Sequence, residues 1–580
     1  MTNPIGRSVY ATSLSSIADY VRDRLVANDE GRFWFVLAFG LGLISALSFE
    51  VRAFALPIDT ISSDARMFLS WMGQWDNPDL LNGDFVADYW KAVSPWAYTG
   101  VFRLAWELGL PPVVFAKIIP ALLLLLVPVF TFRFIRAING EPLVAFLASA
   151  AVLHYLARAI VSGTPRDLWP ILLLAILDGL ARGRIFQTAL AQLLLTGSYP
   201  QMAMATATMI GLTFLDFFPR LKADLSRQRI VLIAVCAMAT ITGILPFLVS
   251  SGGYAPSFSL AEALKIPTFQ PGGRGQLFPA NGAFNVLCGS RLSFLVNCNG
   301  AAILKPSLLV GLVLGGSIVL FLRKQRAAKG IMASNIPFLL MIASILWFIL
   351  ARAMLFRLHL PNRYTAATEL LIYLTAFPLV VEWVRRRLQS NSLWLSRSGR
   401  RVLVGGAIIL LIVCALGAVN VRVAFTRPNL ELLNALRGLP ETSVVGGFVE
   451  DLDFSPALTN RSTLFSRELA IAYQKGYFLP IMARMEAVKD IVMTHDPEVL
   501  VDRISALKIT HLVIRQSDLS EARLPPAFRS FFDEAQLKRD EDVEKRVGSI
   551  LSKLAPICTA GVYNGVSLIS TTCLVEAAKR

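Results

Sequence analysis

Long apolar segments recur through the chain up to about residue 425, and short polar segments separate them. A helix of roughly 20 apolar residues is long enough to cross the hydrocarbon core of a bilayer. Such runs lie near 33–52, 113–135, 142–160, 168–183, 202–218, 229–249, 305–323, 335–352, 364–384 and 402–422. A shorter run at 186–197 fits a short or tilted helix. The pattern therefore predicts an α-helical polytopic membrane protein with about 11 transmembrane helices.

The pattern changes near residue 426, where long apolar runs give way to short mixed segments. Strands are expected at 443–448 and 510–515, and helices at 473–490 and 496–507. A hairpin is expected at 562–574, because Asn564-Gly565 is a favoured two-residue turn. We therefore expect residues 426–580 to form an α/β domain, which is long enough to bury a core of its own.

The composition agrees with a membrane protein. Of the 580 residues 55% are hydrophobic and 17% are charged, and the mean hydropathy of +0.57 is too high for a soluble chain of this length. The formal net charge is +16, but the residues from Arg427 onward carry 19 Lys and Arg against 20 Asp and Glu. The excess charge therefore belongs to the membrane part, where basic loops set orientation, and nucleic acid is a poor explanation for it.

The basic residues also predict which way the chain is inserted. Lys and Arg are densest in the segments that a cytoplasmic N-terminus places in the cytoplasm, above all Arg385-Arg386-Arg387. We expect residues 1–32 to be a cytoplasmic leader and residues 33–425 to be the transmembrane domain, in a bacterial inner (plasma) membrane. With an odd number of spans, the extracytoplasmic segments are the loops 56–112 and 250–304 and the domain 426–580.

Four cysteines fall in these predicted outer segments. Cys288 and Cys298 share one loop, and Cys558 and Cys573 lie near the end of the domain. Disulfides persist in oxidising compartments, so we expect two of them, Cys288–Cys298 and Cys558–Cys573. The alternative is that all four are free thiols.

The first outer loop is unusually acidic. It holds Asp59, Asp64, Asp76, Asp79, Asp84 and Asp88. Carboxylates beside a membrane are costly unless water, a cation or a substrate compensates them. Asp64 precedes the amphipathic run Met67, Phe68, Trp71 and Trp75, which is typical of a helix lying on a membrane. Asp64 would then reach a substrate at the membrane surface and act as a general base, whereas the alternative is a solvated loop.

Two further aspartates have a spacing that suggests binding. Asp84 and Asp88 are four residues apart and would share one face of a helix. Their oxygens could bind the hydroxyl groups of an acceptor or a divalent cation. The sequence does not decide whether a cation binds here or whether the protein uses a metal at all.

Arginines near the predicted outer ends of later spans form a complementary set. Arg166, Arg357 and Arg363 lie there, against the usual excess of positive charge on the inner side. Because a guanidinium binds phosphate through two parallel hydrogen bonds, these residues are candidates for binding a lipid phosphate. The alternatives are snorkelling or pairing with Asp167 and Glu369.

These features together resemble the GT-C superfamily of membrane glycosyltransferases. The likeness rests on one span followed by an outer loop with Asp64, an amphipathic stretch and Asp84/Asp88, then many spans and an outer α/β domain. The segment Asp496–Arg515 also looks like one found in bacterial membrane proteins of this kind. The resemblance implies a polyprenyl-phosphate sugar donor and an acidic residue that acts at the transfer step. The adjacent acidic pair of several GT-C families is absent, since Ala65 and Arg66 follow Asp64.

The leading hypothesis is therefore a glycosyltransferase that moves a sugar from a polyprenyl-phosphate donor to a glycan, lipid or protein acceptor outside the cytoplasm, with inversion. Asp64 would be the general base, and Arg166, Arg357 and Arg363 would hold the donor phosphate. One alternative is a lipid-linked sugar flippase or transporter. Another is an oligosaccharide polymerase or ligase of envelope polysaccharide synthesis. The donor sugar, the acceptor and the oligomeric state stay open.

Overall fold

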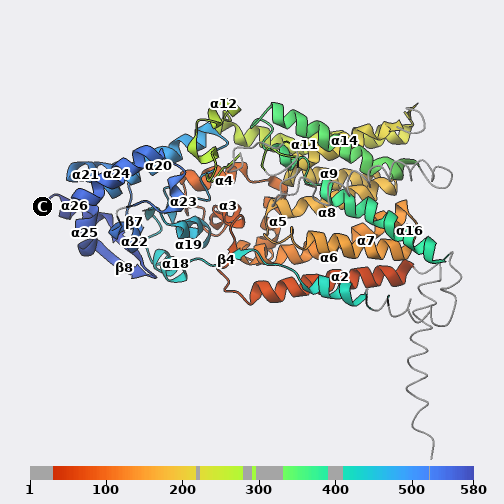
Figure 1. The fold of residues 1–580 in the computed structure, drawn as a ribbon, viewed down its shortest axis with the longest axis horizontal. Helices are drawn as coiled ribbons and strands as arrows, with labels where there is room; N and C mark the ends of the chain where they lie inside the picture. Colours follow the sequence, from red (N-terminus) through yellow and green to blue (C-terminus); the bar gives the residue numbers. More distant parts are fainter. Residues whose placement is uncertain are drawn as a thin grey trace, which may run out of the picture.

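The computed structural model describes residues 31–216, 222–277, 286, 290–294, 331–389, 406, 409, 411–521 and 523–580. Helices run side by side to form a bundle, and the C-terminal part of the chain forms a second region at one end of it (Figure 1). Within the described residues, five helical segments are long and apolar enough to cross a membrane. They are Gly31–Phe54, Pro112–Ile138, Arg227–Val249, Asn335–Ala353 and Pro361–Glu382.

The predicted apolar runs that fall on described residues are largely helical. The bundle helices are α2 (Gly31–Phe54), α6 (Pro112–Ile138), α7 (Pro142–Leu156), α8 (Pro165–Ala181), α9 (Ile185–Ser198), α10 (Pro200–Gly211), α11 (Arg227–Ser250), α14 (Ile331–Ala353), α15 (Thr368–Leu371), the π-helical turn η6 (Ile372–Ala376) and α16 (Phe377–Gln389). The predicted run 305–323 and the start of 402–422 lie outside the described residues. The multi-pass architecture follows from these helices, while the total of 11 spans stays a prediction.

The first and last of the predicted spans lie against each other. The hydroxyl of Ser45 in α2 donates to the carbonyl of Ala418, and that of Ser48 donates to the carbonyl of Val419. Just beyond α2, strand β1 (Ile61–Ser62) pairs antiparallel with β4 (Phe425–Thr426). The start of the first loop is therefore held beside the entrance to the C-terminal region.

A buried lysine fixes the end of the first span. Lys117 of α6 is completely buried, and its Nζ donates to the carbonyl oxygens of Ala53, Leu56 and Pro57 at 3.2, 3.4 and 2.8 Å. Ala53 lies in the last turn of α2, where a helix leaves its carbonyls without partners, and Leu56 and Pro57 follow the end of the helix. Lys117 satisfies these carbonyls and turns the chain into the first loop.

That loop folds into short helices and not into one long surface helix. Its elements are α3 (Ala65–Leu69), the 3₁₀ turn η1 (Met72–Trp75), α4 (Phe85–Val93) and α5 (Trp96–Glu107). Met67 and Trp71 are buried, and Phe68 packs edge-on against Trp90 and Tyr98. The prediction that this apolar run lies on the membrane was wrong, because α4 and α5 cover its apolar face with protein.

The second outer loop packs against the C-terminal region. It contains η3 (Ser251–Tyr254), α12 (Leu260–Ala263) and η4 (Pro267–Phe269). The Phe258 N–H donates to the carbonyl of Tyr473, and the Lys475 N–H donates to that of Pro256. Lys475 also pairs with Glu262 at 2.6 Å. The two segments are therefore joined by backbone and side-chain bonds.

The C-terminal region, here called the C-terminal domain, is an α/β structure built on a five-stranded sheet. Its strands are β5 (Val444–Gly446), β6 (Ser462–Thr463), β7 (His511–Arg515), β8 (Thr559–Tyr563) and β9 (Val566–Ser570), in the order β6-β5-β7-β9-β8. Strands β6, β5 and β7 are parallel, and β9 is antiparallel to β7 and β8. The helices around it are α18 (Leu430–Arg437), α19 (Ser455–Thr459), α20 (Lys475–Met493), α21 (Pro497–Leu507), α22 (Gln516–Ser520), α23 (Pro526–Arg529), α24 (Glu534–Val547), α25 (Ile550–Cys558) and α26 (Thr571–Ala578).

The elements predicted for this region are found with small shifts at their ends. The hairpin turns at Asn564 and Gly565, whose φ values of 49° and 76° are the positive values that such a turn requires. The second strand ends at Ser570, earlier than predicted, because α26 begins at Thr571. The Cys558–Cys573 disulfide is present and joins α25 to α26. The predicted Cys288–Cys298 pair lies outside the described residues.

Candidate functional site

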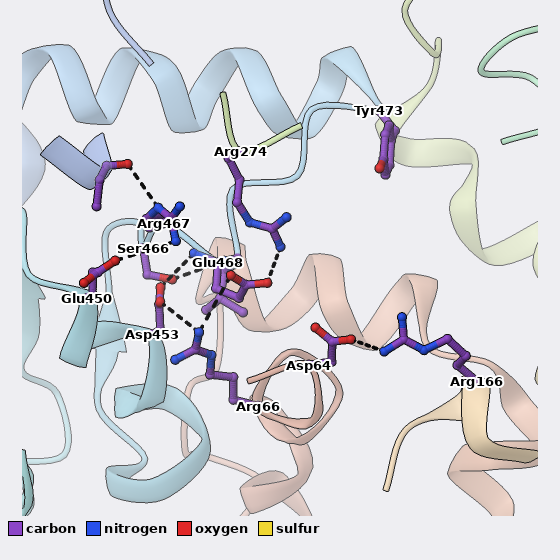
Figure 2. A network of polar contacts seen from close by, with 12 residues as sticks. Asp64, Arg66, Arg166, Arg274, Glu450, Asp453, Ser466, Arg467, Glu468 and Tyr473 are labelled. Atoms are coloured by element: carbon purple, nitrogen blue, oxygen red, sulfur yellow. Dashed lines mark hydrogen bonds and ion pairs between the residues drawn. The ribbon is translucent and has the colours of Figure 1, made fainter. Parts of the chain in front are cut away.

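The candidate site lies where the short helices of the first loop meet both the bundle and the C-terminal domain. Figure 1 shows α3 and α4 between these two regions. Figure 2 shows that Asp64 points toward Arg166, while Arg66, two residues later in the chain, points into a second set of charged residues on the C-terminal domain. The site thus has an accessible part around Asp64 and a buried part around Arg66.

Asp64 is the residue immediately before α3. It does not cap that helix with its side chain, so its carboxylate is available for other contacts. The carboxylate forms an ion pair with Arg166, and the two side chains are 32% and 42% exposed. Asp64 is therefore accessible to a substrate, and its partner is one of the arginines that the sequence suggested for phosphate binding.

Arg166 is held at the start of α8 by its neighbour Asp167. The buried Asp167 carboxylate accepts hydrogen bonds from the Ser162 and Gly163 N–H groups, both at 2.8 Å, and from the Ser162 hydroxyl at 2.9 Å. A Cβ at Gly163, whose φ is +66°, would lie 2.2 Å from the Ala116 carbonyl oxygen. This closed turn fixes the position of Arg166. Because the Asp167 carboxylate is already hydrogen-bonded to Ser162 and Gly163, Arg166 pairs with Asp64 instead.

Arg363 adds a second guanidinium to the site. It ends the 3₁₀ turn η5 (Pro361–Arg363), and its Nη1 lies 3.5 Å from the Tyr199 hydroxyl oxygen. Its charge also interacts with Asp64 and with Tyr473. The buried Nε of Arg363 has no hydrogen-bond partner among the described residues. A guanidinium has five N–H donors, so Arg363 keeps donors for an anion.

Tyr473 extends this group from the C-terminal domain. Its hydroxyl oxygen accepts a hydrogen bond from Arg291 Nη1 at 2.8 Å, and the His359 ring packs edge-on against its ring at 4.9 Å between centroids. Burial, with the nearby charges of Arg363 and Arg291, lowers the pKa of His359 to about 3. The imidazole is therefore neutral at physiological pH, and the positive charge here comes from the arginines.

The buried part of the site is centred on Arg66. Its Nη2 lies 3.2 Å from an Asp453 carboxylate oxygen and 3.7 Å from a Glu468 carboxylate oxygen. Glu468 is also paired with Arg274 of the second outer loop. Burial raises the pKa of Asp453 to about 6, although Arg66 and a hydrogen bond from the Glu468 N–H favour its charged form. Two arginines and two carboxylates from three distant segments thus form one network (Figure 2).

Asp84 and Asp88 have different surroundings. Asp84 is buried and precedes α4, where its carboxylate accepts from the Ala87 N–H at 2.7 Å and from the Ser462 hydroxyl. Burial raises the pKa of Asp84 in spite of these bonds. Asp88 is partly exposed, and its charge is felt by Tyr254 of η3. Asp84 therefore caps α4 and ties it to β6, and Asp88 is the more accessible of the two.

The carboxylates do not form a ready cation site. Among the described residues, no three His, Cys, Asp or Glu side chains gather as metal ligands. Asp64 is engaged by Arg166, and Asp84 by the start of α4. The residues present do not match a divalent cation site, which needs several free oxygens around one point, and we derive no step through a metal.

The structure brings together more residues than the sequence suggested. Arg357 is exposed, and the contacts that assemble the site do not include it among the described residues. Tyr199, Arg291 and Tyr473 were not predicted. Tyr199 follows a short apolar run as part of a polar turn, which is a weak signal, whereas Arg291 and Tyr473 are placed only by folding.

No protein-family model and no curated protein sequence matches the chain. Among solved structures, the fold is similar to the archaeal oligosaccharyltransferase AglB from Archaeoglobus fulgidus in complex with an inhibitory peptide and a dolichol-phosphate. The TM-score is 0.51 at 11% identity, and the match covers 88% of this chain and 72% of AglB. The chain therefore has the fold of this oligosaccharyltransferase.

Two other solved structures are similar to a lower degree. The A. fulgidus oligosaccharyltransferase tethered to an acceptor peptide containing the NVT sequon has a TM-score of 0.49 at 10% identity, and the match covers 84% of this chain and 70% of that one. The arabinofuranosyltransferase AftD from Mycobacteria has a TM-score of 0.45 at 14% identity, covering 86% and 36%. At 11% identity the likeness to AglB establishes the fold alone, and substrates have to be argued from the site.

Proposed function

We propose that the protein is a membrane glycosyltransferase that moves a sugar from a polyprenyl-phosphate donor to an extracytoplasmic glycan, lipid or protein acceptor, with inversion. The observation that carries the proposal is the accessible Asp64 carboxylate, which is paired with Arg166 and interacts electrostatically with Arg363, at the junction of a GT-C-like bundle and its C-terminal domain. A carboxylate paired with one guanidinium and interacting electrostatically with a second combines a proton acceptor with phosphate ligands.

In this reaction Asp64 accepts the proton of the acceptor hydroxyl. The hydroxyl oxygen attacks C1 of the donor sugar on the face opposite the phosphate, and the C1–O bond breaks as the new bond forms. The electron pair of the broken bond leaves with the phosphate oxygen. Arg166 and Arg363 stabilise the charge that develops there, which is the usual role of preorganised cations in such a site.

The pair with Arg166 has a consequence for the order of events. A carboxylate bonded to a guanidinium has its oxygens occupied, so it is less available to an acceptor hydroxyl. A phosphate oxygen that bonds to Arg166 competes for the same donors and relieves this effect. Donor binding would therefore prepare Asp64 for proton transfer, and Arg363 would hold the phosphate from the other side.

The remaining candidates fit secondary roles. Asp88, partly exposed beside Tyr254, would bind acceptor hydroxyl groups, and Asp84 would support it by fixing the start of α4. Arg357, exposed before the turn that ends at Arg363, would attract the lipid phosphate at longer range. The arginine distribution favours a cytoplasmic N-terminus and an extracytoplasmic C-terminal domain in a bacterial inner membrane.

Complementation of a deletion strain tests the proposal inside the cell, where the natural donor and acceptor are both present. Mass spectrometry would compare surface glycans and lipid-linked sugars in strains carrying the natural protein, Asp64→Asn or the control Asp79→Asn, which changes an exposed acid of the same loop. We expect Asp64→Asn to lose the glycan and accumulate the lipid-linked sugar, since loss of a general base costs about 10²–10⁴-fold in rate. Asp79→Asn should complement fully.

Normal glycan in the Asp64→Asn strain would contradict the proposed role of Asp64. A donor that accumulates only on the cytoplasmic face of the deletion strain would favour a lipid-linked sugar flippase over a transferase.

A further inference from the structure

Arg66 links the loop that carries Asp64 to the C-terminal domain. The two residues are separated by Ala65 alone, but they face different surroundings, since Asp64 is accessible and the Arg66 side chain is only 7% exposed. The guanidinium carbon of Arg66 lies 4.3 Å from the centre of the Phe454 ring, in the turn η8 (Glu450–Phe454) of the C-terminal domain. Arg66 is therefore held by charges and by an aromatic face of the same domain.

The partners of Arg66 are themselves fixed. Asp453 accepts a hydrogen bond from the Glu468 N–H at 2.8 Å, and Glu468 also bonds to Arg274. Buried charges are tolerated only when they are paired and hydrogen-bonded, and removing one member leaves the others unpaired. Because this network has two positive and two negative members, each member restricts where the others can lie.

The helix that follows Asp64 cannot hold this position alone. Helix α3 has five residues and lacks a side-chain cap at its start. Isolated helices of this length are unstable in water, because the cost of forming the first turn is not recovered. The placement of Asp64 therefore depends on the contacts that α3 makes with its surroundings.

We propose that Arg66 is a positioning residue for Asp64, so that the C-terminal domain sets where the general base stands relative to the donor. This inference rests on the proposed function for its catalytic consequence. Its structural part, that Arg66 holds α3 in place, stands on the network alone.

The chain offers a matched control for this idea. Asp59 and Arg437 also join the first loop to the C-terminal domain, with 2.7 Å between Oδ1 and Nη2. Asp59 precedes β1, and the other side-chain hydrogen bonds of Arg437 go to Leu458 and Asn434 of the C-terminal domain, so among the described residues the pair has no bond to α3 or to the network around Arg66. Loss of the Asp59–Arg437 pair should weaken the junction without displacing Asp64.

The experiment compares Arg66→Met, Arg66→Lys and Arg437→Met in the full-length purified protein. Turnover is measured with lipid-linked sugar extracted from the deletion strain, and binding is measured with undecaprenyl phosphate. We expect Arg66→Met to lower kcat by about 10²-fold, since misplacement of a catalytic group by about 1 Å has an effect of that size. The affinity for undecaprenyl phosphate should change less than about twofold, because Arg166 and Arg363 are retained.

Arg66→Lys should recover part of the lost kcat, since it keeps a positive charge but not the two-sided geometry of a guanidinium. Arg437→Met should leave kcat near that of the natural protein. A normal kcat in Arg66→Met would overturn the proposal. An equal loss of kcat in Arg66→Met and Arg437→Met, in step with their melting temperatures, would also overturn it.

Hydrogen exchange at the amides of residues 65–72 gives a readout independent of activity. We expect faster exchange there in Arg66→Met and not in Arg437→Met. If the natural protein transfers no sugar but Arg66→Met shows this local increase, the proposed function fails and the positioning role stands. Unchanged exchange in Arg66→Met would remove the positioning role whatever the activity.

Discussion

Arg363 Nη1 lies 3.5 Å from the hydroxyl oxygen of Tyr199, and the buried Nε of the same guanidinium has no partner among the described residues. Tyr199 stands between α9 and α10, so this contact fixes the arginine against the bundle. An arginine held in this way with donors to spare is prepared to bind an anion without further ordering of its side chain.

The first prediction follows from the contrast between Arg363 and Arg357. Arg363→Ala should weaken binding of undecaprenyl phosphate by about 10–100-fold, because it removes charge-assisted hydrogen bonds of about 1.5–3 kcal/mol. Arg357→Ala should weaken it by less than about threefold, and that effect should vanish in high salt, because an exposed charge is screened. Titration of the purified variants at two salt concentrations checks both. Equal losses of affinity in the two variants would contradict the prediction that Arg363 contributes more to phosphate binding than Arg357.

The second prediction concerns pH. Burial raises the pKa of Asp453 from 3.8 to about 6. The folded protein therefore binds a proton at Asp453 more tightly than the unfolded chain does. This contribution to stability is present below about pH 4 and is lost as the pH rises through about 6, by at most about 3 kcal/mol. Asp453→Asn should therefore flatten the dependence of the melting temperature on pH between 4 and 7. Parallel curves for the natural protein and the variant would show that Asp453 does not titrate there.

The third prediction concerns the disulfide. Cys558–Cys573 closes a loop with a sequence separation of 15, and a cross-link of this length typically stabilises a domain by about 3 kcal/mol. Replacement of both cysteines by serine should lower the free energy of unfolding of the C-terminal domain by about that amount, as measured in a urea titration. Cys236 and Cys414 serve as internal controls in non-reducing peptide mapping, because they are unpaired and should be alkylated without reductant once the protein is unfolded.

The fourth prediction concerns orientation. The distribution of arginine favours a cytoplasmic N-terminus and an extracytoplasmic C-terminal domain. Alkaline phosphatase fused to the C-terminus should be active, and a fluorescent protein that folds only in the cytoplasm should be dark there. A bright fluorescent fusion with an inactive phosphatase would place Asp64 on the cytoplasmic side and would remove the polyprenyl donor argument.

The sequence predicted the parts of this fold that depend on local signals. Helices followed from runs of apolar residues, and the hairpin followed from Asn564-Gly565, whose preference for positive φ is a property of the two residues themselves. The burial of Met67 and Trp71 could not be predicted in the same way. An apolar face shows that something must cover it, and periodicity does not distinguish lipid from protein.

The candidate site was predictable in part for a similar reason. The unusual acidity of the first loop drew attention to Asp64, but its pairing with Arg166 joins residues 102 positions apart. Asp84 was expected to bind a ligand, and its place before α4 after Asn82-Gly83 is a cap signal that would have favoured a structural role. The network of Arg66 with Asp453 and Glu468 depends on contacts nearly 400 residues apart, for which a single sequence carries no signal.

The contact between α2 and residues 418–419 has a further consequence. The hydroxyls of Ser45 and Ser48 bond to carbonyl groups of residues 418 and 419, and every amino acid offers a carbonyl. The exposed residue at 419 can therefore change while these hydrogen bonds persist, provided that the two serines on α2 are kept, whereas packing restricts the buried Ala418. Because only one partner in each bond depends on its side chain, the contact can persist between homologues of low sequence identity. We expect homologues to tolerate substitution at residue 419 far more readily than at Ser45 or Ser48.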